Sequence, residues 1–141
     1  MKKTLSLIFV VLGLVAGLPA FAQQDKDKQP SMEELAAQEA DRLGRLLDLE
    51  DWQIFYVDST LQHDYVEMDL ELKSMQAAKV GNTNLYYTVQ DKWMDQIDKT
   101  YQKFFTEDQW AKYLKSGAAR RQKDREKRRE KAAKAAAKTK K

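Results

Sequence analysis

His63 is the side chain best suited to metal chemistry, because it is the only histidine in a chain of 141 residues that has no cysteine. Zinc sites are built from imidazole, thiolate and carboxylate ligands. Asp64 is adjacent to His63, and Glu67 follows one helical turn later. Because the sequence supplies no further imidazole or thiolate, we favour an exposed histidine on a long helix and predict no metal site.

Catalytic groups in a recognisable arrangement are also lacking in the sequence. It holds no glycine-rich phosphate-binding loop and suggests no pair of nucleophile and base. The acidic residues are scattered over helix faces, where a solvated carboxylate is the usual outcome. We therefore expect a protein that is not an enzyme and that uses no cofactor.

Aromatic side chains are the other group that could act, by binding rather than by catalysis. The chain has three Trp, six Tyr and five Phe, and most of them are expected in the core. Long helices enclose a limited interior, so some aromatic and methionine side chains should stay exposed and form a partner surface. The candidates for this surface are Phe55, Tyr56, Tyr65, Met68, Tyr86 and Tyr87.

The strongest local signal in the sequence is a helix start at Thr106. Thr106 is a good N-cap, and Gln109 is placed to bond back to the Thr106 amide, which completes a capping box. Phe105 and Trp110 occupy the two positions of a hydrophobic staple. These residue types predict a structural role for the segment.

A second segment repeats this pattern earlier in the chain. Residues 49–53 and 105–109 both read as apolar, any residue, acidic, any residue, Gln, with Glu50 at the place of Thr106. Ser31 and Glu34 form a further capping box, which starts the first helix. The motif residues to which we assign a helix-capping, structural role are Leu49, Gln53, Phe105, Thr106 and Gln109.

Helical periodicity covers most of the remaining chain. Apolar residues recur every three or four positions from Trp52 to Met75, which indicates a helix rather than a strand. Gly81 is expected to end this helix, and Thr83 or Asn84 to cap the next one. The predicted helices cover residues 31–47, about 50–79, 83–104 and from 106 onward. The fold class predicted is all-α, with four helices and a long central antiparallel hairpin, extended rather than globular.

The N-terminal residues have the form of an export signal. Lys2 and Lys3 precede an apolar run over 5–18, and the A-x-A site at 20–22 predicts cleavage before Gln23. We expect a cleaved signal peptide over 1–22, a flexible leader over 23–30 and a helical domain over 31–117. Since no cysteine follows the site, lipoprotein processing is excluded, and we predict a periplasmic protein that is soluble after cleavage.

The charge is divided unevenly along the chain. Residues 118–141 hold twelve Lys or Arg and three Asp or Glu, while residues 23–117 hold eleven basic and nineteen acidic side chains. This basic tail, rich in Ala, Lys and Arg, is expected to be a frayed helix or disordered. It is either a solvated segment or a contact for an anionic surface, and the export signal argues against nucleic acid.

The two motif segments, the hairpin between them, the signal and the basic end together resemble the Spy/CpxP group of periplasmic LTxxQ-motif proteins. The likeness covers roughly residues 31–120, with Phe105 and Glu50 departing from the motif. It implies a four-helix all-α fold, a thin curved antiparallel homodimer and ATP-independent binding of unfolded proteins under envelope stress. Some members of the group instead regulate a stress-sensor kinase, and others bind metal.

Two functions follow as hypotheses. The first is a holdase-like periplasmic chaperone that binds unfolded envelope proteins through exposed aromatic and apolar helix surface. The alternative is a periplasmic adaptor or stress-sensor regulator, which binds one specific envelope partner while the basic tail contacts an anionic surface. The acidic body departs from the positively charged cradle that the resemblance implies, which leaves the class of client open.

Overall fold

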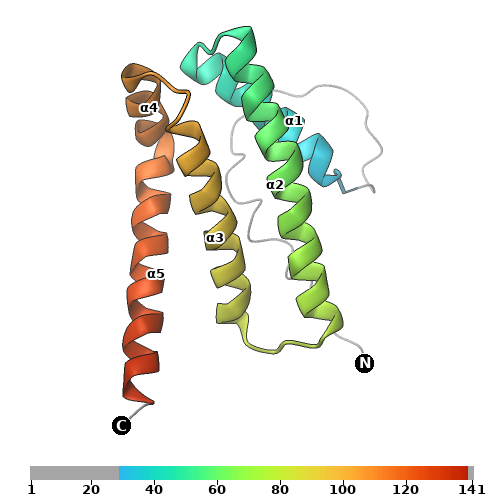
Figure 1. Cartoon of the computed structure of the whole chain (residues 1–141), viewed down its shortest axis with the longest axis vertical. Coiled ribbons are helices and arrows are strands. Elements are labelled where there is room, and N and C mark those ends of the chain that lie inside the picture. Colours follow the sequence, from blue (N-terminus) through green and yellow to red (C-terminus); the bar gives the residue numbers. More distant parts are fainter. Residues whose placement is uncertain (1–28, 140–141) are drawn as a thin grey trace.

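The computed structural model describes residues 29–139, and every regular element among them is helical, which confirms the all-α prediction (Figure 1). The elements are α1 (Met32–Leu47), α2 (Asp51–Ala77), α3 (Thr83–Tyr101), α4 (Glu107–Tyr113), a π-helical turn η2 (Leu114–Ala118) and α5 (Ala119–Lys138). The expected signal peptide and most of the expected leader lie outside the described residues.

The helix starts follow from local capping chemistry. Ser31 and Thr106 cap α1 and α4, and each has the full capping box that the sequence predicts. Asn82, rather than Thr83 or Asn84, caps α3 by accepting a hydrogen bond from the Asn84 amide at 3.0 Å. All three caps place a side-chain oxygen where a first-turn amide would otherwise lack a partner.

The end of α2 differs from the sequence prediction. Lys79 takes the left-handed conformation, with φ of 56°, whereas Gly81 has no positive φ. The Lys79 and Val80 amides donate to the carbonyls of Gln76 and Met75. Gly81 therefore lies in the loop and is not the residue that ends the helix.

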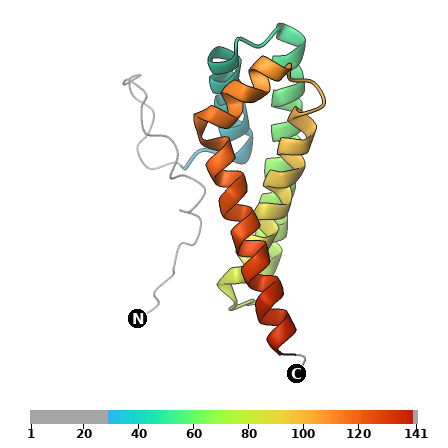
Figure 2. The same ribbon diagram turned by 90° about the vertical axis from the view of Figure 1, so that its left-hand side faces the viewer.

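The helices pack with α1 against α2, α2 beside an oppositely directed α3, and α5 along α3 (Figures 1 and 2). The core lies where α1, α2 and α3 meet, and its largest fully buried apolar side chains are Leu43, Leu47, Val57, Leu61, Ile97 and Tyr101. Gly44 allows close approach there, since a Cβ at this position would lie 3.2 Å from Ile54 Cδ1.

Gly117 sets the direction of the last helix. Its φ of 105° is a conformation that only glycine adopts without strain, and it lies inside η2 between α4 and α5. The reorientation at this residue sends α5 back along α3 (Figure 2).

Within residues 118–139, the structure differs from the expectation of a frayed or disordered tail. Residues 119–138 form a continuous helix, and Arg125 within it is only 3 % exposed. Polar side chains of α3 hold α5 in place, an attachment that the pattern of apolar residues does not reveal. None of the helices that the structure describes is long and apolar enough to cross a membrane.

Candidate functional site

Three aromatic side chains at the start of α2 are largely exposed. Trp52, Phe55 and Tyr56 have exposed fractions of 48 %, 66 % and 53 %. Ring centroids lie 6.1 Å apart for Trp52 and Tyr56, and 5.8 Å apart for Phe55 and Tyr56. With the half-buried Phe104, which contacts both Trp52 and Tyr56, they form what we call the surface aromatic cluster.

The surface aromatic cluster is held in place from beneath. Phe104 packs edge-on against Tyr101 and Phe105, whose rings are buried in the core. The Trp52 indole N–H donates to the carboxylate of Glu50 at 2.6 Å, which restrains the ring. Because the cluster rests on rigid neighbours, its rings present a defined apolar surface.

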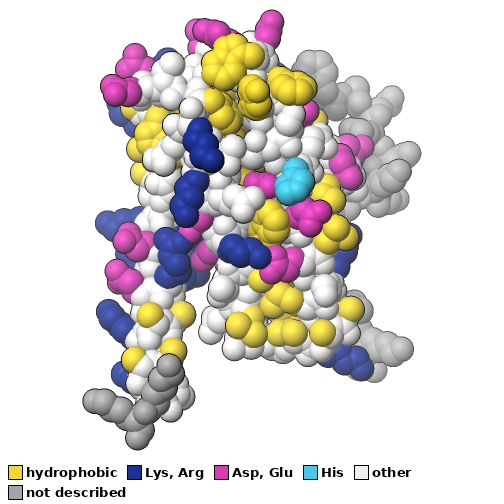
Figure 3. Space-filling view, viewed as in Figure 1, with side chains coloured by type: hydrophobic (Ala, Val, Ile, Leu, Met, Phe, Trp, Pro, Cys, Tyr) yellow, Lys and Arg dark blue, Asp and Glu magenta, His cyan; other side chains and the backbone are white. Residues whose placement is uncertain are grey.

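Apolar side chains gather at this end of the molecule, where α1, α2 and the loop before α4 meet, and again near the turn between α2 and α3 (Figure 3). Leu70 and Leu85, with exposed fractions of 54 % and 46 %, are exposed leucines of α2 and α3. The adjacent, exposed rings of the surface aromatic cluster can bind apolar segments of another chain.

The structure corrects two of the predicted surface residues, Met68 and Tyr86, and leaves a third, Tyr65, half-buried. Met68 and Tyr86 are buried, and the Tyr86 hydroxyl donates to the Val80 carbonyl at 2.9 Å. Tyr65 packs against the core, and burial raises the pKa of its hydroxyl. Hydrophobic periodicity identifies the faces of a helix but not the face that a neighbour covers, so these residues could not be separated from exposed ones.

Of the other predicted surface residues, Phe55 and Tyr56 are exposed and Tyr87 is half-buried. The guanidinium of Arg128 lies over the Tyr87 ring, with Cζ 5.7 Å from its centroid. Trp52, which the sequence prediction omitted from the surface, belongs to the cluster. Its position one helical turn before Tyr56, on the same face of the helix, was the signal that the sequence offered.

The two glutamines of the repeated motif meet in space, 56 positions apart in sequence. The Gln53 amide nitrogen donates to Gln109 Oε1 at 2.7 Å, and the Gln109 amide nitrogen donates to Gln53 Oε1 at 2.9 Å. We call this reciprocal pair the glutamine clasp. Gln53 is only 2 % exposed and Gln109 is half-buried, so these bonds are partly shielded from water.

Each glutamine of the clasp also caps its own helix. Gln53 Oε1 accepts from the Glu50 amide, and Gln109 Oε1 accepts from the Thr106 amide, each at 3.0 Å. The Gln53 amide nitrogen donates further to the Phe104 carbonyl at 2.9 Å. The clasp therefore ties the starts of α2 and α4 together and fixes the loop that carries Phe104.

The two apolar residues of the motif, Leu49 and Phe105, are buried beside the clasp. The Phe105 ring stacks on Tyr101, with centroids 5.0 Å apart. Phe105 and Trp110, expected to form a staple, both contact Tyr113. The motif residues thus build the support under the surface aromatic cluster.

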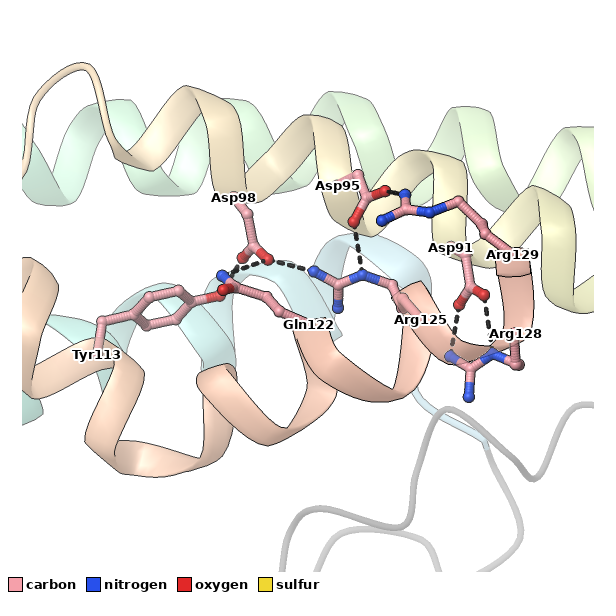
Figure 4. Close-up of polar contacts among 8 residues, drawn as sticks. All are labelled: Asp91, Asp95, Asp98, Tyr113, Gln122, Arg125, Arg128 and Arg129. Atoms are coloured by element: carbon pink, nitrogen blue, oxygen red, sulfur yellow. Dashed lines mark hydrogen bonds and ion pairs between the residues drawn. The ribbon is translucent and has the colours of Figure 1, made fainter. Parts of the chain in front are cut away.

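A series of ion pairs joins α3 to α5 (Figure 4). Asp91, Asp95 and Asp98 lie at successive turns of α3 and face three arginines of α5. Arg128 bonds Asp91 through two nitrogens, at 2.8 and 2.7 Å. Arg125 bonds Asp95 at 2.7 Å and also Asp98, while Arg129 bonds Asp95. We call this set of six residues the ion-pair ladder.

Asp98 is the most interconnected residue of the ladder. Its carboxylate accepts from the Tyr113 hydroxyl at 2.6 Å and from the Gln122 amide at 3.0 Å, in addition to Arg125. Burial and the adjacent Asp98 charge raise the pKa of the Tyr113 hydroxyl. Asp98 and Arg125, 7 % and 3 % exposed, compensate each other's charge away from water.

His63 is exposed on α2, and its Nδ1 lies 2.8 Å from Asp64 Oδ1. The hydrogen bond to Asp64 raises the pKa of the imidazole above its usual value. Among residues 29–139, no group of three or more His, Cys, Asp or Glu side chains is placed to hold a metal ion. Glu67 lies on the same helix but forms no such group with His63 and Asp64.

Glu71 and two side chains of α3 cross-link α2 and α3 farther along. The Glu71 carboxylate accepts from Lys92 Nζ at 2.5 Å and from the Trp93 indole N–H at 2.8 Å. These bonds lower the pKa of Glu71, and the bond from Lys92 is the larger cause.

Comparison of the whole chain with protein-family models, with curated proteins and with solved structures finds no match.

Proposed function

We propose that this protein is an ATP-independent, holdase-like chaperone that binds apolar segments of unfolded proteins through the surface aromatic cluster. The observation that carries the proposal is the group of adjacent rings of Trp52, Phe55 and Tyr56, each about half exposed or more. In soluble proteins, exposed and contiguous apolar surface of this kind marks interaction sites.

The chemistry of the cluster favours clients with little structure. Its rings offer flat apolar faces, and the polar groups around them, the Glu50 carboxylate and the clasp amides, are already bonded within the protein. A binding surface without directional polar groups selects for apolar content rather than for one sequence. This property suits a holdase better than a regulator with a single partner.

The resemblance to the Spy/CpxP group adds the expected setting. We propose that the protein works in the periplasm, after cleavage of residues 1–22, and forms a homodimer. The resemblance implies a thin, curved antiparallel dimer, and a second copy would cover the exposed Leu85 of α3. Sedimentation of the purified protein as a strict monomer would contradict the dimer.

The test is suppression of aggregation of an unfolding client protein without ATP. The Phe55→Glu variant places a charge in the cluster at a side chain that is 66 % exposed, so the fold should be retained. Burying the exposed part of one phenylalanine contributes about 2 kcal/mol to client binding, so the variant should suppress aggregation only at roughly 10- to 30-fold higher concentration.

Leu70→Glu is the matched control, since Leu70 lies on the same helix and is 54 % exposed but belongs to no aromatic cluster. We expect Leu70→Glu to suppress aggregation like the parent protein. No suppression by the parent protein at several-fold molar excess would refute the chaperone proposal. Equal loss in both variants would refute the assignment of the site to the cluster.

A further inference from the structure

The cations of α5 lie on two opposite faces of the helix. Arg125, Arg128 and Arg129 face α3 and are bonded to its aspartates. The lysines recur at every third or fourth position, and this spacing places them within one narrow strip of an α-helix on the side away from Arg125. We call this strip the lysine row: Lys123, Lys127, Lys131, Lys134 and Lys138.

All five side chains of the lysine row are exposed. Among residues 29–139, none of them takes part in an ion pair, in contrast to the three arginines on the opposite face. Four of them line a single surface hollow together with Glu130 and Ala135. At ~1.5 Å per residue the row is about 22 Å long, with one cation in each turn.

The row is open along its length. Figure 3 shows Lys and Arg side chains along α5, which projects past the turn between α2 and α3 (Figure 1). Beyond Lys131 the intervening side chains of α5 are alanines, which do not screen the ammonium groups. A straight, unobstructed row of cations can contact a flat anionic surface with every member at once.

We propose that the lysine row docks the protein onto a membrane that contains anionic lipids. Each lysine held near such a surface adds electrostatic attraction, and α5 has no large apolar side chain that would insert into the bilayer. The attachment is therefore peripheral, reversible and sensitive to salt. It leaves the ion-pair ladder intact, because the arginines of the ladder face the other way.

Nucleic acid is the competing anionic partner, and the composition of α5 disfavours it. Proteins read and grip nucleic acids with bidentate arginines and with aromatic rings that stack on bases. The helix contains no aromatic residue, and three of its arginines are committed to aspartates of α3. Lysine ammonium groups without adjacent aromatic rings or free arginines are better suited to the phosphate headgroups of a flat membrane surface.

The test compares binding of the purified protein to vesicles of phosphatidylcholine mixed with phosphatidylglycerol and to vesicles of phosphatidylcholine alone. We expect co-sedimentation with the anionic vesicles only, which high salt abolishes. Replacing Lys127, Lys131, Lys134 and Lys138 by Gln should lower the partition coefficient roughly 100- to 1,000-fold, since each lysine contributes about five-fold.

A matched control removes four exposed lysines outside α5, at Lys79, Lys103, Lys112 and Lys115. It changes the net charge equally and should reduce binding far less. Equal losses in both variants, or no binding of the parent protein to anionic vesicles, would overturn the proposal. Tighter binding to duplex DNA than to anionic vesicles at the same ionic strength would assign the row to nucleic acid instead.

Membrane docking and the proposed chaperone function can fail separately. The lysine row and the surface aromatic cluster lie on different helices, α5 and α2. The row variant should therefore suppress client aggregation in solution as the parent protein does, and Phe55→Glu should bind anionic vesicles normally. Loss of vesicle binding in Phe55→Glu would contradict a site confined to α5.

Discussion

Arg125 allows the attachment of α5 to be tested in quantitative terms. Its side chain is 4 % exposed and bonds Asp95 and Asp98, so the Arg125→Met variant keeps most of the volume while leaving two aspartates without their shared cation. Removing one partner of a buried ion pair costs about 3–5 kcal/mol. The lower end applies here, because Asp98 keeps its hydrogen bonds from Tyr113 and Gln122.

The loss should fall on α5 before the rest of the fold, because the ladder supplies most of the hydrogen bonds between α5 and α3. A detached helix of 20 residues is only marginally stable in water. A change of about 3 kcal/mol raises the exchange rate of α5 backbone amides roughly 100-fold in native-state hydrogen exchange. Amides in the core of α2 should exchange as they do in the parent protein.

Arg129→Met is the matched control for this experiment. Arg129 also bonds Asp95, but its side chain is 58 % exposed, and a pair of that kind contributes about 0–1 kcal/mol. We expect at most a few-fold faster exchange in α5. A similar increase in both variants, or an increase below ten-fold in Arg125→Met, would show that buried charge pairing does not hold α5 in place.

Two further predictions concern the clasp and the histidine. Gln109→Glu keeps the capping oxygen that Thr106 needs but removes the N–H donated to Gln53, so the free energy of unfolding in urea should fall by about 1–2 kcal/mol. Glu34→Gln is the control, because Glu34 closes a capping box that makes no bond to a second box, and it should change the free energy of unfolding by less than about 0.5 kcal/mol. Equal effects of the two variants would contradict a stabilising role of the clasp. His63 should titrate above its usual pKa in an NMR experiment, and Asp64→Asn should lower that pKa. Since folding raises this pKa, the contribution of the His63–Asp64 pair to stability is complete below the unfolded-state pKa and is lost as pH rises through the folded-state pKa. A pKa of His63 at or below about 6.5 in the parent protein would contradict this prediction.

The clasp also explains why the motif ends in glutamine rather than glutamate. Either side chain closes a capping box, because each has an oxygen that accepts from the N-cap amide. Only glutamine adds an N–H, and both Gln53 and Gln109 use theirs to bond the other. The choice of residue therefore reflects a tertiary contact that follows from neither motif alone.

The local elements follow from the sequence, because they depend on neighbours within one helical turn. Ser31 and Thr106 start helices through their own first-turn amides, and apolar spacing of three or four predicts the all-α fold. The exposure of Phe55 and Tyr56 was also predicted. The end of α2 was not, because Lys79 rather than Gly81 adopted the left-handed turn.

Tertiary structure alone decided which faces meet. Met68 and Tyr86 follow the same periodicity as exposed residues, yet they are buried in the folded chain. The basic tail looked solvated because it lacks apolar residues, yet Asp98 lies where Arg125 can reach it, 27 positions apart. Periodicity within one helix carries no information on the charge opposite it, so the attachment of α5 emerges only when the chain is folded.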